Sequence, residues 1–148
     1  MSSVLRINGD SFDVDRFLIE TGLVPYLHYR TGDDIGFKKR GKEKYETNGC
    51  SFDLSTAEFD NFEKQKTDTI SFLTIHFDKL VKLRSYGLSP EDIPLIDFAI
   101  ESDTVTYPVQ NDYLQPELLK LAGDLSFGIR LSYYDKTYFN EIQDKNEK

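Results

Sequence analysis

The single cysteine and the two histidines are the residues whose types could support nucleophilic catalysis. A cysteine nucleophile needs a neighbouring base and a partly exposed, electropositive setting, and His28 and His76 are the candidate bases for Cys50. We expect Cys50 to face inward on a strand as a small hydrophobic residue, and both histidines to be structural. We therefore assign no catalytic residue. A small hydrolase that uses Cys50 or a carboxylate with His28 or His76 is the alternative.

Three aspartates, Asp10, Asp13 and Asp15, have the carboxylates that bind hard cations. Their spacing lacks the glycine at the sixth position and the closing glutamate of a calcium loop. Helix capping by Asp13 and the favourable helix dipole at Asp15 explain these residues without a metal. With 2 histidines and 1 cysteine, a Cys/His zinc site cannot form within one chain. We predict no metal and no cofactor.

A basic stretch could bind an anion or single-stranded nucleic acid through cations and stacked rings. The chain as a whole has 26 acidic and 18 basic side chains and a net charge of −8 at pH 7, so it repels phosphate backbones. We therefore expect a solvated hairpin, and nucleic-acid binding through residues 37–45 is a further alternative. The candidate anion-binding residues of this stretch are Lys38, Lys39, Arg40, Lys42 and Lys44.

Solubility alone explains the acidic excess of many proteins and is the favoured interpretation here. The sharper interpretation is attraction to a basic protein partner, because complementary charge steers association. The leading hypothesis is a non-enzymatic binding protein, in its most concrete form an immunity-like protein that covers a basic toxin. Burial of aromatic residues at the contact would follow the electrostatic steering. The candidate partner-binding residues are Asp97, Glu101, Asp103, Tyr107 and Tyr113.

Apolar runs are short throughout the chain. No run approaches the roughly 18 residues that span a bilayer, and we see no secretory signal. One cysteine fits a reducing compartment, and an acidic surface disfavours docking on anionic membranes. We predict a cytoplasmic protein, either a monomer or a homodimer joined through an edge strand near Pro108.

Hydrophobic periodicity and turn residues predict the elements that must position these side chains. A helix begins after the N-cap Asp13 and ends at Gly22. Residues 55–66 show no clear pattern, and the segment from residue 135 forms either a short helix or a mobile tail. Further helices are expected over 68–86, with Gly87 as the stop, and from Pro116 to a stop at Gly123. Strands are expected over 4–7, 26–30, 50–54, 95–101, 104–107 and 127–133, with hairpin arms at 35–39 and 44–47.

The resulting order is β-α-β-β-α-β-β-α-β. It predicts an α+β fold, in which helices cover one face of a mixed, mainly antiparallel sheet. A ferredoxin-like core with additions is the predicted topology. The 148 residues form one domain by size.

Three segments together resemble a known family. They are the opening strand and helix from Leu5 to Leu23, the stretch from Arg30 to the strand that ends at Leu54, and Leu114–Leu119 followed by the strand that ends at Tyr134. In this order they resemble the bacterial family catalogued as domain of unknown function 4279, over residues 4–134. The resemblance implies a single intracellular α+β domain and carries over no catalytic residue. Small proteins of this kind resemble antitoxin or immunity proteins of bacterial toxin loci.

Overall fold

The computed structural model describes residues 1–36 and 43–137. Its elements in chain order are β1 (Ser3–Gly9), α1 (Val14–Thr21), β2 (Leu27–Tyr29), β3 (Asn48–Ser55), α2 (Phe62–Ile75), α3 (Phe77–Leu80), the 3-10 helix η1 (Leu83–Tyr86), β4 (Leu95–Ser102), α4 (Pro116–Leu125) and β5 (Gly128–Asp135).

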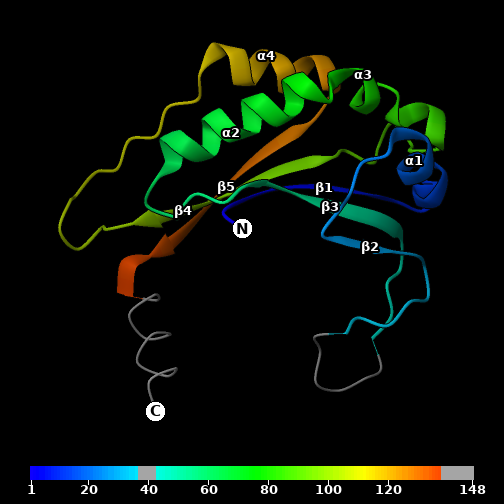
Figure 1. Cartoon of the computed structure of the whole chain (residues 1–148). Coiled ribbons are helices and arrows are strands. Elements are labelled where there is room, and N and C mark those ends of the chain that lie inside the picture. The colour runs from blue at the N-terminus through cyan, green and yellow to red at the C-terminus, as the bar shows by residue number, and fades with distance from the viewer. Residues whose placement is uncertain (37–42, 138–148) are drawn as a thin grey trace.

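The strands form one five-stranded sheet in the order β2-β3-β1-β4-β5. The pairs β2–β3, β3–β1 and β1–β4 are antiparallel, and β5 joins β4 in parallel. Figure 1 shows α2, α3 and α4 lying over one face of this sheet. The α+β class with a mixed, mainly antiparallel sheet is confirmed, and the ferredoxin-like topology stays a prediction.

The core lies between the helices and the covered face of the sheet. Alternate residues of the central strands point into it, as the period of two in a strand requires. They meet Phe17 of α1 and Leu118 of α4, both fully buried. The inward strand residues are Leu5 and Ile7 of β1, Cys50, Phe52 and Leu54 of β3, and Ile96, Phe98 and Ile100 of β4.

The first helix matches its prediction at both ends. The carboxylate of Asp13 accepts a hydrogen bond from the Arg16 backbone N–H at 3.1 Å. Gly22 has φ 67°, in the left-handed region, and its N–H donates to the Leu18 carbonyl at 3.0 Å. The cap and the glycine act locally, which is why sequence alone places them.

The single helix expected over 68–86 is wrong. α2 begins earlier, after the N-cap Asn61, whose side chain accepts from the Lys64 N–H. The helix then stops at His76, where φ −104° and ψ 11° leave the helical region. α3 and η1 follow, and Gly87 with φ 83° ends the stretch as predicted.

The strand expected over 104–107 is also wrong. The Asp103 carboxylate accepts from the Thr106 N–H at 2.9 Å, and the Asp103 carbonyl accepts from the Tyr107 N–H at 3.1 Å. These bonds wind the chain into a turn, as aspartate side chains favour. No hairpin therefore follows β4, and among the described strands β2 and β5 form the sheet edges. The predicted dimer would have to use one of those strands.

The last helix runs two residues past its expected stop at Gly123. α4 continues to Leu125, and Ser126 takes the left-handed conformation at φ 58° instead. A serine here carries no glycine-like signal, so the sequence pattern placed the end too early. Residue 135, assigned to a tail, is the last residue of β5. Lys136 and Thr137 follow it, and residues 138–148 lie outside the described residues.

Candidate functional site

Cys50 is a core residue and not an exposed thiol. Its exposed fraction is 0%, and burial raises the pKa of the thiol to about 12. His28 is the backbone partner of Cys50 across the β2–β3 pair, but its side chain is exposed whereas Cys50 is fully buried. Catalysis by cysteine requires the thiolate, and a buried thiol with this pKa is neutral at physiological pH. The pair therefore supplies no activated nucleophile.

His76 lies far along the chain from that pair, between α2 and α3. Its ring packs edge-on against Phe72 with centroids 4.6 Å apart. Burial lowers the pKa of His76, and the nearby Lys79 lowers it further. His76 thus packs at the junction of α2 and α3, and its structural role stays a prediction.

The three N-terminal aspartates border a cavity of about 300 Å³ at the start of α1. Asp13 caps the helix, and Asp15 receives two hydrogen bonds from the Arg30 guanidinium at 2.7 and 2.9 Å. That pairing is the main reason that the pKa of Asp15 is lowered. In residues 1–36 and 43–137, no group of three histidine, cysteine, aspartate or glutamate side chains is placed to hold a metal ion.

Of the five candidate anion-binding residues, the structure describes Lys44 alone. Lys38, Lys39, Arg40 and Lys42 lie outside the described residues. Lys44 is described, and its ammonium donates to the Asp34 carboxylate. Backbone hydrogen bonds join residues 32–35 to 43–45, so the two sides of the stretch pair as a hairpin requires. Lys44 is thus already engaged by a carboxylate.

The five candidate partner-binding residues do not form one group. Asp97 lies on the sheet face opposite the core, where its side chain is 13% exposed. Its carboxylate accepts from Ser132 Oγ at 2.8 Å and lies 3.4 Å from Arg6 and 3.7 Å from Arg130. These contacts tie Asp97 to β1 and β5. Its part in partner binding stays a prediction.

The other four candidates follow one another along the chain, at the end of β4 and on the segment after it. We name residues 102–115 the acidic loop. Together with its flanks, residues 101–117, this segment contains four carboxylates, Glu101, Asp103, Asp112 and Glu117, and no lysine, arginine or histidine. Large apolar or aromatic side chains project from the loop between 64% and 85% exposed, namely Val105, Tyr107, Val109 and Tyr113.

Hydrogen bonds from the body of the protein hold the acidic loop in place. Lys66 of α2 is completely buried, and its ammonium donates to the Tyr113 carbonyl at 2.5 Å and to Glu63 at 2.7 Å. The same ammonium lies 4.5 Å from the centre of the Phe62 ring. Tyr133 of β5 donates to the Asp112 carboxylate at 2.6 Å, which raises the pKa of Tyr133 to about 12.

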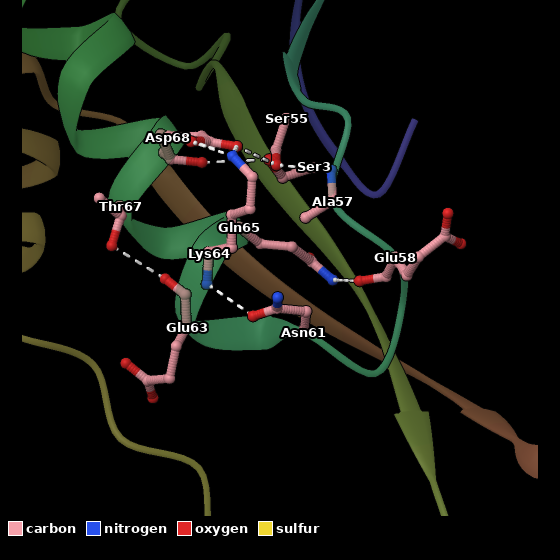
Figure 2. A network of polar contacts seen from close by, with 11 residues as sticks. Ser3, Ser55, Ala57, Glu58, Asn61, Glu63, Lys64, Gln65, Thr67 and Asp68 are labelled. Atoms are coloured by element: carbon pink, nitrogen blue, oxygen red, sulfur yellow. Dashed lines mark hydrogen bonds and ion pairs between the residues drawn. The ribbon is translucent and has the colours of Figure 1, made fainter.

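Sequence reasoning missed Lys66 and its neighbours on α2. We name Gln65, Lys66 and Thr69, with Ser3 and Ser55 beneath them, the polar layer; all five are buried. Figure 2 shows the Gln65 side chain extending to the Glu58 backbone and Lys64 extending to Asp68 at the edge of this layer. The buried positions 62, 65, 66, 69 and 73 have the spacing of one helix face, but polar residues hide the pattern.

No family model, no curated protein and no solved structure matches this chain. The resemblance to domain of unknown function 4279 therefore stays a prediction. None of the helices within the described ranges has the length and apolar character needed to cross a bilayer.

Proposed function

We propose that this protein is a non-enzymatic, cytoplasmic binding protein that binds a basic protein partner through the acidic loop. The observation that carries the proposal is the composition of that loop, in which four exposed apolar or aromatic side chains project from a segment with carboxylates alone as charged groups. Exposed apolar groups gathered in one place mark interaction surfaces.

Tyrosines at such a surface contribute large contact areas at low entropic cost. Tyr107 and Tyr113 supply these areas, and tyrosine is enriched among the residues that dominate binding energy. The carboxylates around them attract a cationic partner and favour it over acidic competitors. Lys66 and Tyr133 hold the loop before binding, which lowers the ordering cost of association.

In its most concrete form the proposal is an immunity-like role, in which the loop covers the functional surface of a basic toxin. Support for this form comes from the charge of the chain and from the resemblance of such small proteins to immunity proteins. A small hydrolase receives less support, because Cys50 is buried and its pKa is raised. Nucleic-acid binding through 37–45 receives less support as well, because Lys44 is paired with Asp34.

Site-specific photo-crosslinking in the host cell tests the proposal. A photoreactive amino acid replaces Tyr107 in one variant and Ile19 in the control, because Ile19 on α1 is 81% exposed but lies outside the acidic loop. We expect position 107 to capture a specific basic protein, encoded near this gene, that position 19 does not capture. The capture should weaken as salt rises, since salt screens exposed charges.

Affinity for the captured partner gives the quantitative test. If Tyr107 is a main contributor, Tyr107→Ala should weaken binding by at least about 30-fold, the equivalent of the 2 kcal/mol that defines such residues. Ile19→Ala should leave the affinity unchanged. Equal capture at both positions, or no captured protein at low salt, would show that the acidic loop is not a binding surface.

A further inference from the structure

A second cavity, of about 400 Å³, lies on the sheet face opposite the core. No described helix covers this face (Figure 1). The volume is in the range of pockets that hold small organic molecules. None of the residues around it belongs to the acidic loop, so this cavity is separate from the surface proposed above. The residues that line it include Arg6, Asn8, Tyr26, Tyr29, Tyr45 and Ser51.

Two stacked tyrosines form one wall of this cavity. The rings of Tyr29 and Tyr45 are nearly parallel, with an interplanar angle of 10° and centroids 3.7 Å apart. Tyr29 also lies against Gly49, where a Cβ would come within 2.6 Å of the Tyr29 hydroxyl and 2.8 Å of the Ile7 carbonyl. The glycine thus leaves the space that Tyr29 occupies, and Tyr45 stacks over Tyr29 as a flat aromatic surface.

A positive charge lies beside the aromatic wall. The Arg6 guanidinium is half-exposed and 3.4 Å from Asp97, whose carboxylate also lies 3.7 Å from Arg130. Two guanidiniums therefore share one carboxylate, so the cluster carries one positive charge in excess. Ser132 donates to the other oxygen of Asp97 at 2.8 Å, which orients the carboxylate that Arg6 contacts at the cavity.

Neutral polar groups complete the lining. The Asn8 amide donates to Thr47 Oγ at 3.5 Å, which orients its carbonyl oxygen. The Ser51 hydroxyl and the Tyr26 ring add a further donor and a further aromatic surface. Amides and hydroxyls of this kind can both donate to and accept from the edge of a heteroaromatic ring.

We propose that this cavity binds a nucleoside monophosphate, with the base stacked on Tyr45 and the phosphate facing Arg6. Stacking on an aromatic side chain suits every base, because each base has a flat π-face. Guanidinium groups bind phosphate through paired, charge-assisted hydrogen bonds. The cavity thus combines a stacking surface and a phosphate-binding cation.

The net negative charge of the protein favours binding of a single nucleotide over binding of a nucleic acid strand. The net charge of −8 repels a chain of phosphates, and Asp53 lies on the same face, two residues beyond Ser51 on β3. A single phosphate needs only the cation that Arg6 supplies. Sugars also stack on aromatic rings, and they serve below as the competing class of ligand.

Calorimetric titration and amide chemical-shift mapping of the full chain test the proposal. The probes are AMP, GMP, UMP and CMP, with adenosine, ribose 5-phosphate, glucose and galactose as comparisons. We expect at least one nucleotide to bind and to shift the amides of residues 6, 8, 26–29, 45 and 51. Tyr45→Ala should weaken that binding by about 5- to 150-fold, the range for loss of one stacked base.

Matched variants separate stacking from loss of folding. Tyr45→Phe keeps the ring and should retain the affinity, and Ile19→Ala removes an exposed side chain of α1 and should leave nucleotide binding unchanged. Arg6→Gln should weaken the binding of the nucleotide but not of its nucleoside. Absence of nucleotide binding at millimolar concentration, binding that survives Tyr45→Ala, or binding of a hexose alone would overturn the proposal. None of these outcomes bears on the acidic loop.

Discussion

Replacing the buried Lys66 by methionine should release the acidic loop while leaving the fold intact. Methionine keeps the apolar stem of the side chain but removes the ammonium that donates to the Tyr113 carbonyl and to Glu63. Glu63 has a 78% exposed side chain, so the variant leaves no unpaired charge in the interior. Breaking a buried pair is costly mainly when such a charge remains.

The change in the free energy of unfolding follows from two opposing contributions, the lost hydrogen bonds and the avoided burial of an ammonium. Each hydrogen bond to a charged group contributes about 1.5–3 kcal/mol, whereas burying an ammonium costs several kcal/mol. The two terms largely cancel in the global free energy of unfolding, which should change by less than about 1 kcal/mol. The local opening of the loop lacks this compensation. It should become about 10- to 150-fold more frequent, as the loss of one charged hydrogen bond predicts.

Limited proteolysis with chymotrypsin measures that opening directly. Tyr113, which is followed by Leu114, provides a cleavage site inside the loop, whereas Pro108 blocks cleavage after Tyr107. The cleavage rate follows the open population when reclosing is fast. Mass spectrometry of the products identifies the cut, and urea unfolding measures global stability. The Tyr133→Phe variant removes the second attachment, through Asp112, and should also accelerate cleavage.

Lys64→Met is the matched control. Lys64 lies two residues away on α2, is half-exposed and pairs with Asp68 instead of the loop. Cleavage within the loop should be the same in this variant as in the natural protein. If Lys66→Met leaves loop cleavage unchanged, or if Lys64→Met accelerates it equally, then Lys66 does not hold the loop.

Three further predictions concern the core and the helix ends. Cys50 should resist a thiol reagent in the folded protein and react on unfolding, because burial holds its pKa near 12, and rapid stoichiometric labelling of the native protein would contradict this. Because the folded state retains the thiol proton more tightly than the unfolded state, the contribution of Cys50 to the free energy of unfolding is present below pH 9.0 and is lost as the pH rises toward 12. Gly22→Ala, at φ 67° with open space around it, should lower the free energy of unfolding in urea by about 1–2 kcal/mol. Gly87→Ala should lower it more, because the added Cβ would clash with the Ser11 carbonyl. Equal losses in the two variants would refute the clash. Asp13→Ala should cost about 1 kcal/mol in the same assay through loss of the helix cap, and an unchanged transition midpoint would rule the cap out.

Local signals account for what the sequence predicted correctly. Asp13 and Gly22 determine the ends of α1 through contacts within a few residues, and the alternation of Cys50, Phe52 and Leu54 is the direct signature of a strand with one buried face. Such features depend on residues next to one another in the chain. They are therefore visible without knowledge of the fold.

The features that escaped prediction depend on distant contacts. The first half of α2 buries Gln65, Lys66 and Thr69, whose partners include the Ala99 carbonyl on β4 and Ser3 on β1. A polar helix face reads as solvent-exposed until those partners are known. The segment 104–107 has the β-branched residues of a strand, but the side chain of Asp103 imposes a turn.

The candidate site was predicted in composition more than in geometry. The sequence identified the acidic and aromatic character around 101–113, and the structure keeps Asp103, Tyr107 and Tyr113 on one loop. It separates Asp97, because neighbouring strands supply the two arginines that surround that carboxylate. The cavity at Tyr29 and Tyr45 depends on stacking of two rings, one on β2 and one on the segment before β3. No residue spacing in the sequence predicts this contact.

The polar layer also restricts how α2 can sit on the sheet. Apolar contacts tolerate small displacements of a helix, whereas hydrogen bonds, which depend on distance and angle, do not. Sliding the helix by one turn, about 5.4 Å, would break the hydrogen bond from the Gln65 amide to the Ala99 carbonyl and the one between the Thr69 hydroxyl and Ser3. The same displacement would carry Lys66 away from the loop it holds. The position of this helix on the sheet and the position of the acidic loop are thus fixed together.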